Sequence, residues 1–212
     1  MSDDLPGPDD ERWMRRALSL ARAQLGKVAP NPAVGCVLVR DDEVIAEAAT
    51  ADGGRPHAEE AALAEAGERA RGAVAYVTLE PCSRRSGGAA SCTDRLIRAG
   101  VARVIIACRD PNPDAAHGAT LLEKAGVPVL LGVMEHEANQ LNRGFFYKLR
   151  TGRPWLAIDD DADSYDATLE LEADETVQAA LERLAAEGAT RVRVATDSAL
   201  IADLRRLGLL DD

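Results

Sequence analysis

Three side chains that bind zinc well lie close together in the sequence, between His57 and Cys92. The chain reads His57-Ala58-Glu59, then Glu80-Pro81-Cys82, and reaches Cys92 after nine intervening residues. Zinc favours histidine nitrogen and cysteine sulfur, and a catalytic site keeps its fourth position open for water. Glu59 is near enough to face that water without binding the metal. The pattern predicts zinc ligands at His57, Cys82 and Cys92, with Glu59 as the proton carrier; a core histidine with two incidental thiols is the alternative.

Strands and helices are expected to alternate through the first 150 residues. Apolar runs predict strands at 35–40, 43–49, 73–79, 101–107 and 127–131. Helical periodicity predicts helices at 10–25, 57–69, 93–99, 120–125 and 134–149. This alternation is typical of a layered α/β domain, in which ligands bind beyond the carboxyl ends of the strands. The loops at Pro81-Cys82 and at 110–113 both fall there.

The character of the chain changes after residue 158, where an acidic and weakly apolar stretch begins. A helix at 175–186, a strand at 192–195 and a helix at 198–207 are expected beyond it. We therefore predict two domains, 9–150 and 151–212.

Charge and composition argue against several classes of partner. The net charge is −11 and aromatic residues make up 3% of the chain, which argues against nucleic acid because phosphate binding needs basic residues and base stacking needs aromatic ones. No apolar run approaches the roughly 20 residues of a membrane span, and the acidic N-terminus does not resemble a signal peptide, so a cytoplasmic location is expected. Cys36 and Cys108 lie in apolar strands and are expected to be core residues.

Several further motifs resemble the deaminase half of the bifunctional riboflavin-biosynthesis deaminase/reductase, a member of the zinc-dependent cytidine-deaminase-like superfamily. The motifs are Pro30-Asn31-Pro32-Ala33-Val34-Gly35-Cys36-Val37, the segment 76–82, Asp110-Pro111-Asn112-Pro113 and Leu141-Asn142-Arg143-Gly144-Phe145-Phe146. The resemblance implies a three-layer α/β/α domain with a central mixed sheet, Zn²⁺ as cofactor, and hydrolysis of the exocyclic amine of a diaminopyrimidinone ribotide. It also implies that Asn31, Asp110 and Asn112 contact this substrate and that the chain forms a homodimer or a higher homo-oligomer.

The chain departs from the family pattern at positions that contact substrate. The family usually has histidine where this chain has Thr50 and Arg84, and its loop before the second cysteine is shorter. We expect Thr50 and Arg84 to be substrate-binding positions with an altered way of holding the substrate. Arg84 and Arg85 are either a grip for a phosphate or carboxylate, or solvated surface residues.

The tail is similar to parts of the family's reductase domain. Residues 153–158 resemble its first strand, and residues 179–212 resemble a later helix, strand and helix. About 60 residues are too few for a nicotinamide pocket, so we expect a small α/β remnant without a bound cofactor. The preferred function is deamination of an aminopyrimidine ribotide or a related amino-heterocycle, in riboflavin biosynthesis or in a specialised pathway. A zinc-binding protein without activity and a nucleic-acid base deaminase are the alternatives.

Overall fold

The computed structural model describes residues 7–85 and 88–210, and these residues form two compact units. The N-terminal unit contains Met1–Ala23, Ala33–Ala51 and Arg55–Leu141. The C-terminal unit contains Asn142–Asp212 together with two short segments from earlier in the chain, Gln24–Pro32 and Asp52–Gly54. The functional division near residue 150 remains a prediction.

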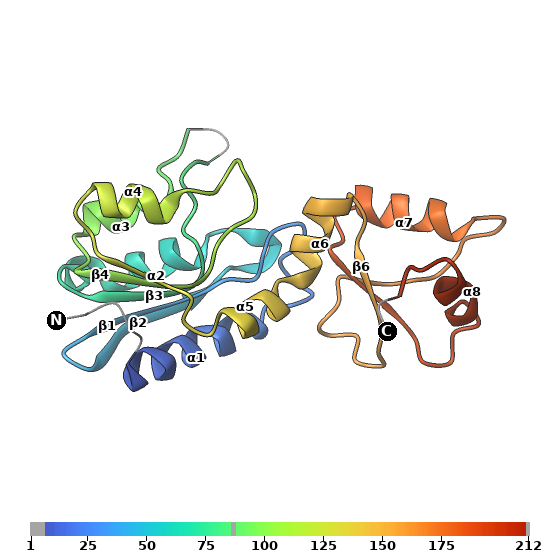
Figure 1. Cartoon of the computed structure of the whole chain (residues 1–212), viewed down its shortest axis with the longest axis horizontal. Coiled ribbons are helices and arrows are strands. Elements are labelled where there is room, and N and C mark those ends of the chain that lie inside the picture. The colour runs from blue at the N-terminus through green and yellow to red at the C-terminus, as the bar shows by residue number, and fades with distance from the viewer. Residues whose placement is uncertain (1–6, 86–87, 211–212) are drawn as a thin grey trace. The chain divides into compact units, whose positions relative to one another are not determined.

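A mixed five-stranded sheet forms the centre of the N-terminal unit (Figure 1). Its order is β2-β1-β3-β4-β5. The strands are β1 (Gly35–Arg40), β2 (Glu43–Ala49), β3 (Val74–Leu79), β4 (Arg103–Cys108) and β5 (Val129–Leu131). Strand β1 runs antiparallel to β2 and β3, whereas β3, β4 and β5 are parallel. Because β3 and β4 are parallel, their carboxyl ends meet at one edge of the sheet.

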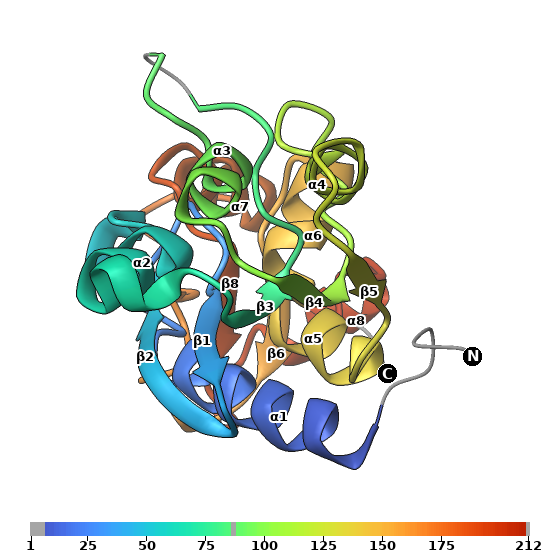
Figure 2. The same ribbon diagram turned by 90° about the vertical axis from the view of Figure 1, so that its left-hand side faces the viewer.

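Helices cover both faces of this sheet, which confirms the three-layer α/β/α fold (Figure 2). On one side, α2 (Ala58–Ala66) packs on β1 and β2 and is followed by α3 (Cys92–Ala99) and α4 (Gly118–Lys124). On the other side, α1 (Pro8–Arg22) contacts β1, β2 and β3, and α5 (Glu135–Leu141) contacts β4. Short 3₁₀ turns lie at η1 (Asp52–Gly54) and η2 (Gly67–Ala70).

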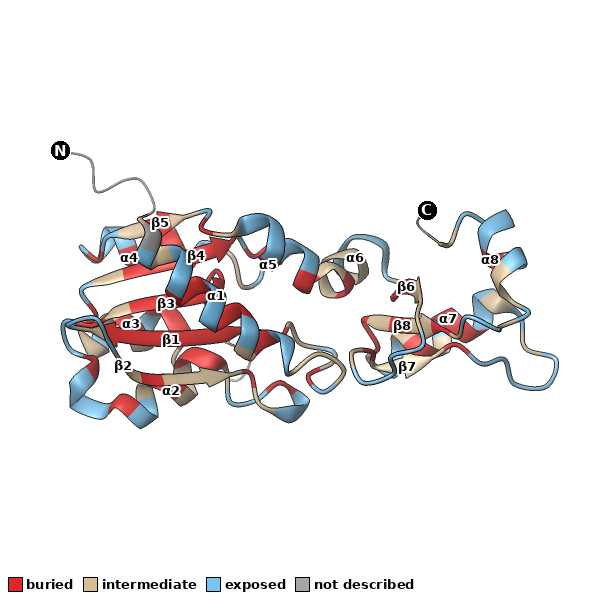
Figure 3. Cartoon of the chain, turned by 90° about the horizontal axis from the view of Figure 1, so that it is seen from below, coloured by how far each residue is buried: buried red, intermediate tan, exposed pale blue. Residues whose placement is uncertain are grey.

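Small aliphatic side chains let these layers approach closely. The central strands β1, β3 and β4 are buried along almost their whole length (Figure 3). Gly35 shows how tight the packing is, because a Cβ atom there would lie 1.9 Å from the carbonyl oxygen of Ala17 in α1. Cys36 and Cys108 are buried in the core, as expected.

The C-terminal unit has a smaller, wholly parallel sheet of order β6-β8-β7. Its elements are α6 (Arg143–Thr151), β6 (Trp155–Ile158), β7 (Ala167–Thr168), α7 (Val177–Ala186), β8 (Arg191–Val194) and α8 (Ile201–Arg206). Leu156, Leu181, Val192 and Leu204 are among the residues of its apolar core. On the opposite face of β6 and β8, Arg191 lies over the rings of Trp155 and Tyr165.

One expectation about the elements is wrong, and one strand was missed. The single helix expected at 134–149 is interrupted at Asn142, which has the non-helical angles φ −96° and ψ 17° and directly precedes α6. The two-residue strand β7 was not expected, since so short an edge strand leaves no periodic signal in the sequence. Across residues 7–85 and 88–210, no helix combines the length and the apolar character needed to cross a membrane.

Candidate active site

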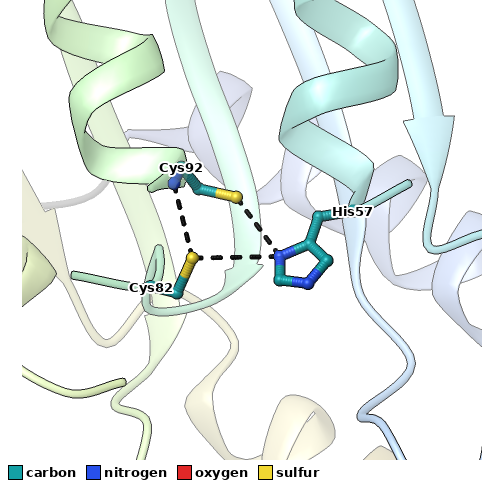
Figure 4. A group of neighbouring side chains, drawn as sticks. All are labelled: His57, Cys82 and Cys92. Carbon is teal, nitrogen blue, oxygen red and sulfur yellow. Dashed lines mark hydrogen bonds between the residues drawn. The ribbon is translucent and has the colours of Figure 1, made fainter. Parts of the chain in front are cut away.

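His57, Cys82 and Cys92 converge at one end of the N-terminal sheet (Figure 4). The Nδ1 atom of His57 lies 3.3 Å from the sulfur of Cys92 and 3.9 Å from the sulfur of Cys82. All three potential ligand atoms lie within 4.8 Å of one another. This is the only group of its kind among the residues that the structure describes.

The spacing of these atoms fits a tetrahedral zinc ion. With Zn–N and Zn–S bonds of about 2.0 and 2.3 Å, neighbouring nitrogen and sulfur ligands should lie about 3.5 Å apart. The two observed nitrogen–sulfur distances bracket that value. Three protein ligands leave the fourth tetrahedral position open, as in catalytic rather than structural zinc sites.

Local helix geometry places the histidine and the second cysteine. His57 is the N-cap of α2, and its side chain makes no capping hydrogen bond, so the ring is left to face the cysteines. Cys92 is the first residue of α3, whose N-terminus is fixed by a capping box between Ser91 and Asp94. The Ser91 hydroxyl accepts a hydrogen bond from the Asp94 amide at 3.0 Å, and the Asp94 carboxylate accepts one from the Ser91 amide at 3.2 Å.

Thr93 joins the two cysteine segments. Its hydroxyl lies 3.2 and 3.0 Å from the carbonyl oxygens of Pro81 and Cys82, and its amide donates to the Cys82 carbonyl. The Cys92 amide donates to the Cys82 sulfur at 3.3 Å. Gly118 packs against the same segment, since a Cβ there would lie 1.9 Å from the Pro81 carbonyl oxygen. The loop that carries Cys82 is therefore held from two sides.

The two sulfurs differ in their affinity for protons. The pKa of Cys82 is lowered to about 4, chiefly by a hydrogen bond from the Cys92 side chain; His57 and the Cys92 amide contribute to the lowering, and burial opposes it. The same contact and burial raise the pKa of Cys92. The site therefore stabilises a thiolate, the form that binds metal.

Glu59 is buried beside this cluster, with 3% of its surface exposed, in the first turn of α2. Burial and the negative charge of Cys82 raise its pKa, while hydrogen bonding and the attraction of His57 act in the opposite direction. A carboxyl group whose pKa is raised toward neutrality can both accept and donate a proton, which suits general acid–base chemistry.

Glu80 ties the next loop of the chain to the end of β3. One carboxylate oxygen accepts from the Asp110 amide at 3.3 Å, and the other accepts from the Ala119 amide at 3.0 Å. Asp110 is itself buried, and burial raises its pKa to about 6. Asp110 thereby lies at the carboxyl end of β4, on the sheet edge that also carries Cys82.

The other expected substrate residues have varied surroundings. Asn112 is partly exposed and accepts a hydrogen bond from Asp114, whereas Thr50 is buried and bonds the backbone of Val34. Arg84 is exposed. Asn31 lies in the segment that belongs to the C-terminal unit, where its amide donates to the Gly53 carbonyl at 3.4 Å. Substrate contact by these residues remains a prediction.

No functional role is predicted for Glu80 or Glu60 from the sequence alone. The position of Glu80 could have indicated a structural role. It directly precedes Pro81-Cys82 at the end of a buried strand, and a buried charge needs hydrogen-bond donors. Glu60 binds both Arg85 and Arg95. Its only sequence signal is a position three residues after His57.

Comparisons with known proteins agree with this geometry. Residues 8–108 match the family model described as "Cytidine and deoxycytidylate deaminase zinc-binding region". Over 150 residues the chain is 50% identical to riboflavin biosynthesis protein RibD of Escherichia coli, a match that covers 70% of this chain and 41% of that protein. Over 147 residues it is 42% identical to the diaminohydroxyphosphoribosylaminopyrimidine deaminase of Buchnera aphidicola from Acyrthosiphon pisum, and that match covers 69% of this chain and 99% of the relative.

A solved structure extends the similarity into the C-terminal unit. The diaminohydroxyphosphoribosylaminopyrimidine deaminase/5-amino-6-(5-phosphoribosylamino)uracil reductase of Thermotoga maritima matches with a TM-score of 0.81 at 25% identity. The match covers 93% of this chain and 84% of that one. The C-terminal residues therefore share their fold with part of a reductase domain, as the sequence analysis expected, although the chain spans about two fifths of the length of the E. coli relative.

Proposed function

The chain belongs to the family of diaminohydroxyphosphoribosylaminopyrimidine deaminases, and we propose that it releases ammonia from the aminopyrimidine ribotide of riboflavin biosynthesis. One observation carries the proposal: His57, Cys82 and Cys92 form a three-ligand site with the buried Glu59 beside it. The Buchnera relative, which this chain covers almost completely, bears the name of that deaminase. A nucleic-acid substrate is disfavoured by the net charge of −11.

The proposed mechanism is hydrolytic, and Glu59 moves the protons. His57, Cys82 and Cys92 would hold the zinc ion, which would supply Lewis acidity and lower the pKa of a water molecule toward neutral pH. Glu59 accepts a proton from the attacking water and passes it to the ring nitrogen next to the carbon under attack. It then transfers the second proton of that water to the leaving amine, so that water and the amine become a carbonyl and ammonia.

Recognition of the ribotide is assigned to the loops around the carboxyl ends of the strands. We assign contacts with the base or ribose to Asn31, Asp110 and Asn112, and further substrate contacts to Thr50 and Arg84. Asp110 is supported by its burial at the end of β4 and by its link through Glu80 to the segment that carries Cys82. Arg84 is supported by its exposure two residues after that cysteine, where a guanidinium is free to bind an anion.

The deaminase proposal is tested by measuring ammonia release from the diaminopyrimidinone ribotide with zinc-loaded protein. Glu59→Gln serves as the matched variant, because it removes the proton carrier and keeps the shape of the side chain. We expect turnover to fall about 10⁴-fold while about one zinc remains bound per chain. Near-normal turnover by Glu59→Gln would refute the role of Glu59, and no release by the wild type with full zinc would refute the proposed substrate.

We propose further that the C-terminal unit is a reductase-like remnant that binds no nicotinamide cofactor. The face of β6 and β8 opposite the apolar core is filled by Trp155, Tyr165 and Arg191, whose side chains stack on one another. We expect no oxidation of reduced nicotinamide cofactor when the deaminated product is supplied. Oxidation at a rate proportional to protein concentration would disprove this proposal.

The last two proposed properties are the oligomeric state of the chain and its location in the cell. We propose that the chain forms a homodimer or a higher homo-oligomer, which light scattering of the zinc-loaded protein would test; a monomeric mass at micromolar concentration would contradict it. A cytoplasmic location remains a prediction from the sequence.

A further inference from the structure

Each of the three zinc ligands is followed, three positions later in the sequence, by a charged residue. Glu60 follows His57, Arg85 follows Cys82, and Arg95 follows Cys92. The fold brings these three charged side chains into contact, and we call them the charged cluster. None of its members is a zinc ligand, and none takes part in the proposed proton transfers.

Glu60 is the centre of the charged cluster. One of its carboxylate oxygens lies 2.8 Å from Nη1 of Arg85, and the other lies 2.8 Å from Nη2 of Arg95. Arg95 also donates from Nε to the Ala90 carbonyl at 3.3 Å. The side chain of Glu60 is 25% exposed and that of Arg85 only 4%, so solvent screens this ion pair less than a surface pair.

Two helices connect the charged cluster to zinc ligands. Glu60 lies in the first turn of α2, and the amide of Ala61 closes that turn by donating to the His57 carbonyl at 3.0 Å. Arg95 lies one turn into α3, which begins at Cys92. Backbone hydrogen bonds make a helical turn stiff, so a ligand and the charged residue in the same turn move together. The ion pair between Glu60 and Arg95 therefore fixes the start of α2 against the start of α3.

The third ligand, Cys82, is connected to the charged cluster through a loop. The Ser83 amide donates to the Ala115 carbonyl at 2.8 Å, which fixes the loop directly after Cys82. The ion pair with Glu60 fixes the loop again at Arg85, two residues further on. One carboxylate therefore joins all three segments that carry the zinc ligands.

We propose that Glu60 is a positioning residue of the zinc site, which holds the three ligand-bearing segments together before the metal binds. Ligands that are held in place lose little conformational freedom on binding, and the affinity for the metal is correspondingly higher. The alternative is an ion pair that stabilises the fold equally with and without zinc, which by linkage leaves the affinity for zinc unchanged. The inference depends on metal binding by His57, Cys82 and Cys92 and is independent of which substrate is used.

The test measures the zinc affinity of the full chain by competition with a chelator. Glu60→Gln removes the charge and keeps the shape of the side chain. Glu65→Gln is the matched control, because it makes the same change at an exposed position of the same helix. We expect the affinity to fall roughly 10-fold in Glu60→Gln and to remain at the wild-type value in Glu65→Gln.

Amide hydrogen exchange with and without zinc tests whether the segments are held before the metal binds. In Glu60→Gln, zinc should slow exchange in residues 58–66 and 92–99 by a larger factor than in wild type. The reason is that these segments open more readily in the zinc-free variant, whereas the wild type holds them without zinc. An ion pair that only stabilises the fold would leave the effect of zinc on exchange unchanged.

Variants of Arg85 test whether the charged cluster acts as a unit. Arg85→Met and the double variant Glu60→Gln/Arg85→Met break the same connection as Glu60→Gln, so we expect all three to lose affinity to about the same extent. The double variant also leaves no buried arginine without its carboxylate, which keeps the test valid if Glu60→Gln alone does not fold.

Three results would overturn the proposal. The first is wild-type zinc affinity in Glu60→Gln or, if that variant does not fold, in the double variant. The second is a loss of affinity without a larger effect of zinc on exchange. The third is a loss in the double variant equal to the sum of the losses in the single variants, since it would show two independent effects. None of these measurements depends on turnover, so failure here is distinct from failure of the deaminase assay.

Discussion

The N-terminal and C-terminal units bury polar side chains to very different extents. Among the described residues, seven polar or charged side chains are buried in the N-terminal unit: Thr50, Glu59, Thr78, Glu80, Ser91, Thr93 and Asp110. The C-terminal unit buries two, Asn142 and Thr190. Buried polar groups cost free energy unless they are bonded. The need for hydrogen-bond partners is therefore concentrated in the unit that carries the metal site.

Net charge is concentrated in the last part of the C-terminal unit. Residues 151–212 contain 15 acidic and 6 basic residues, so they carry −9 of the net charge of −11. Most of these acidic side chains are exposed, and the core beneath them is made of aliphatic residues. This part of the chain thus combines an acidic, solvent-exposed surface with a small apolar core, whereas the N-terminal unit buries ionisable side chains.

The largest effect is expected for Cys82→Ser, which removes one of three ligands. We expect zinc content and turnover to be lost, together with the stabilisation that bound metal gives the N-terminal unit, about 3 kcal/mol at a zinc concentration 100 times the dissociation constant. Amide hydrogen exchange resolved by segment should show faster exchange in residues 58–66 and 92–99, with 177–186 unchanged. Zinc retained at one per chain would remove Cys82 as a ligand.

Leu181→Ala is expected to affect stability alone, in the other unit, without loss of zinc. Leu181 is 1% exposed in the C-terminal core, and truncation of such a leucine costs about 2–5 kcal/mol. We expect faster exchange in residues 177–186 and 191–194 and an unchanged zinc content. Loss of zinc by this variant would contradict the expectation that zinc binding is independent of the C-terminal core.

The smallest effect is expected from the titration of Asp110. Its carboxyl group, with a pKa of about 6 in the fold, binds a proton more tightly there than in the unfolded chain. The free energy of unfolding should therefore fall as the pH rises from about 4 through about 6, by about 2 kcal/mol or less. Asp110→Asn should lack this fall. Urea unfolding of chelator-treated protein measures both curves, and parallel curves would contradict the assignment.

Much of the N-terminal unit could be predicted because its signals are local. Apolar runs place the five strands, and the order of His57, Cys82 and Cys92 indicates the metal cluster. The break at Asn142 could not be predicted, because periodicity continues across it. The ion pair between Glu60 and Arg85 could not be predicted either, because these residues are 25 positions apart in the sequence and meet only in the fold. Arg84 and Arg85 were treated alike from the sequence, yet Arg84 is exposed and the Arg85 side chain is buried.

Glu80 has a consequence for redesign of the protein. The two amides that it binds, those of Asp110 and Ala119, close the ends of one loop, and both ends are fastened to the strand that leads to Cys82. Pro111, Pro113 and Asp114 at the tip of that loop are exposed. Insertions or exchanges at residues 111–114 should therefore leave the metal ligands in place, which makes this loop a suitable position for grafting new substrate selectivity onto an unchanged catalytic centre.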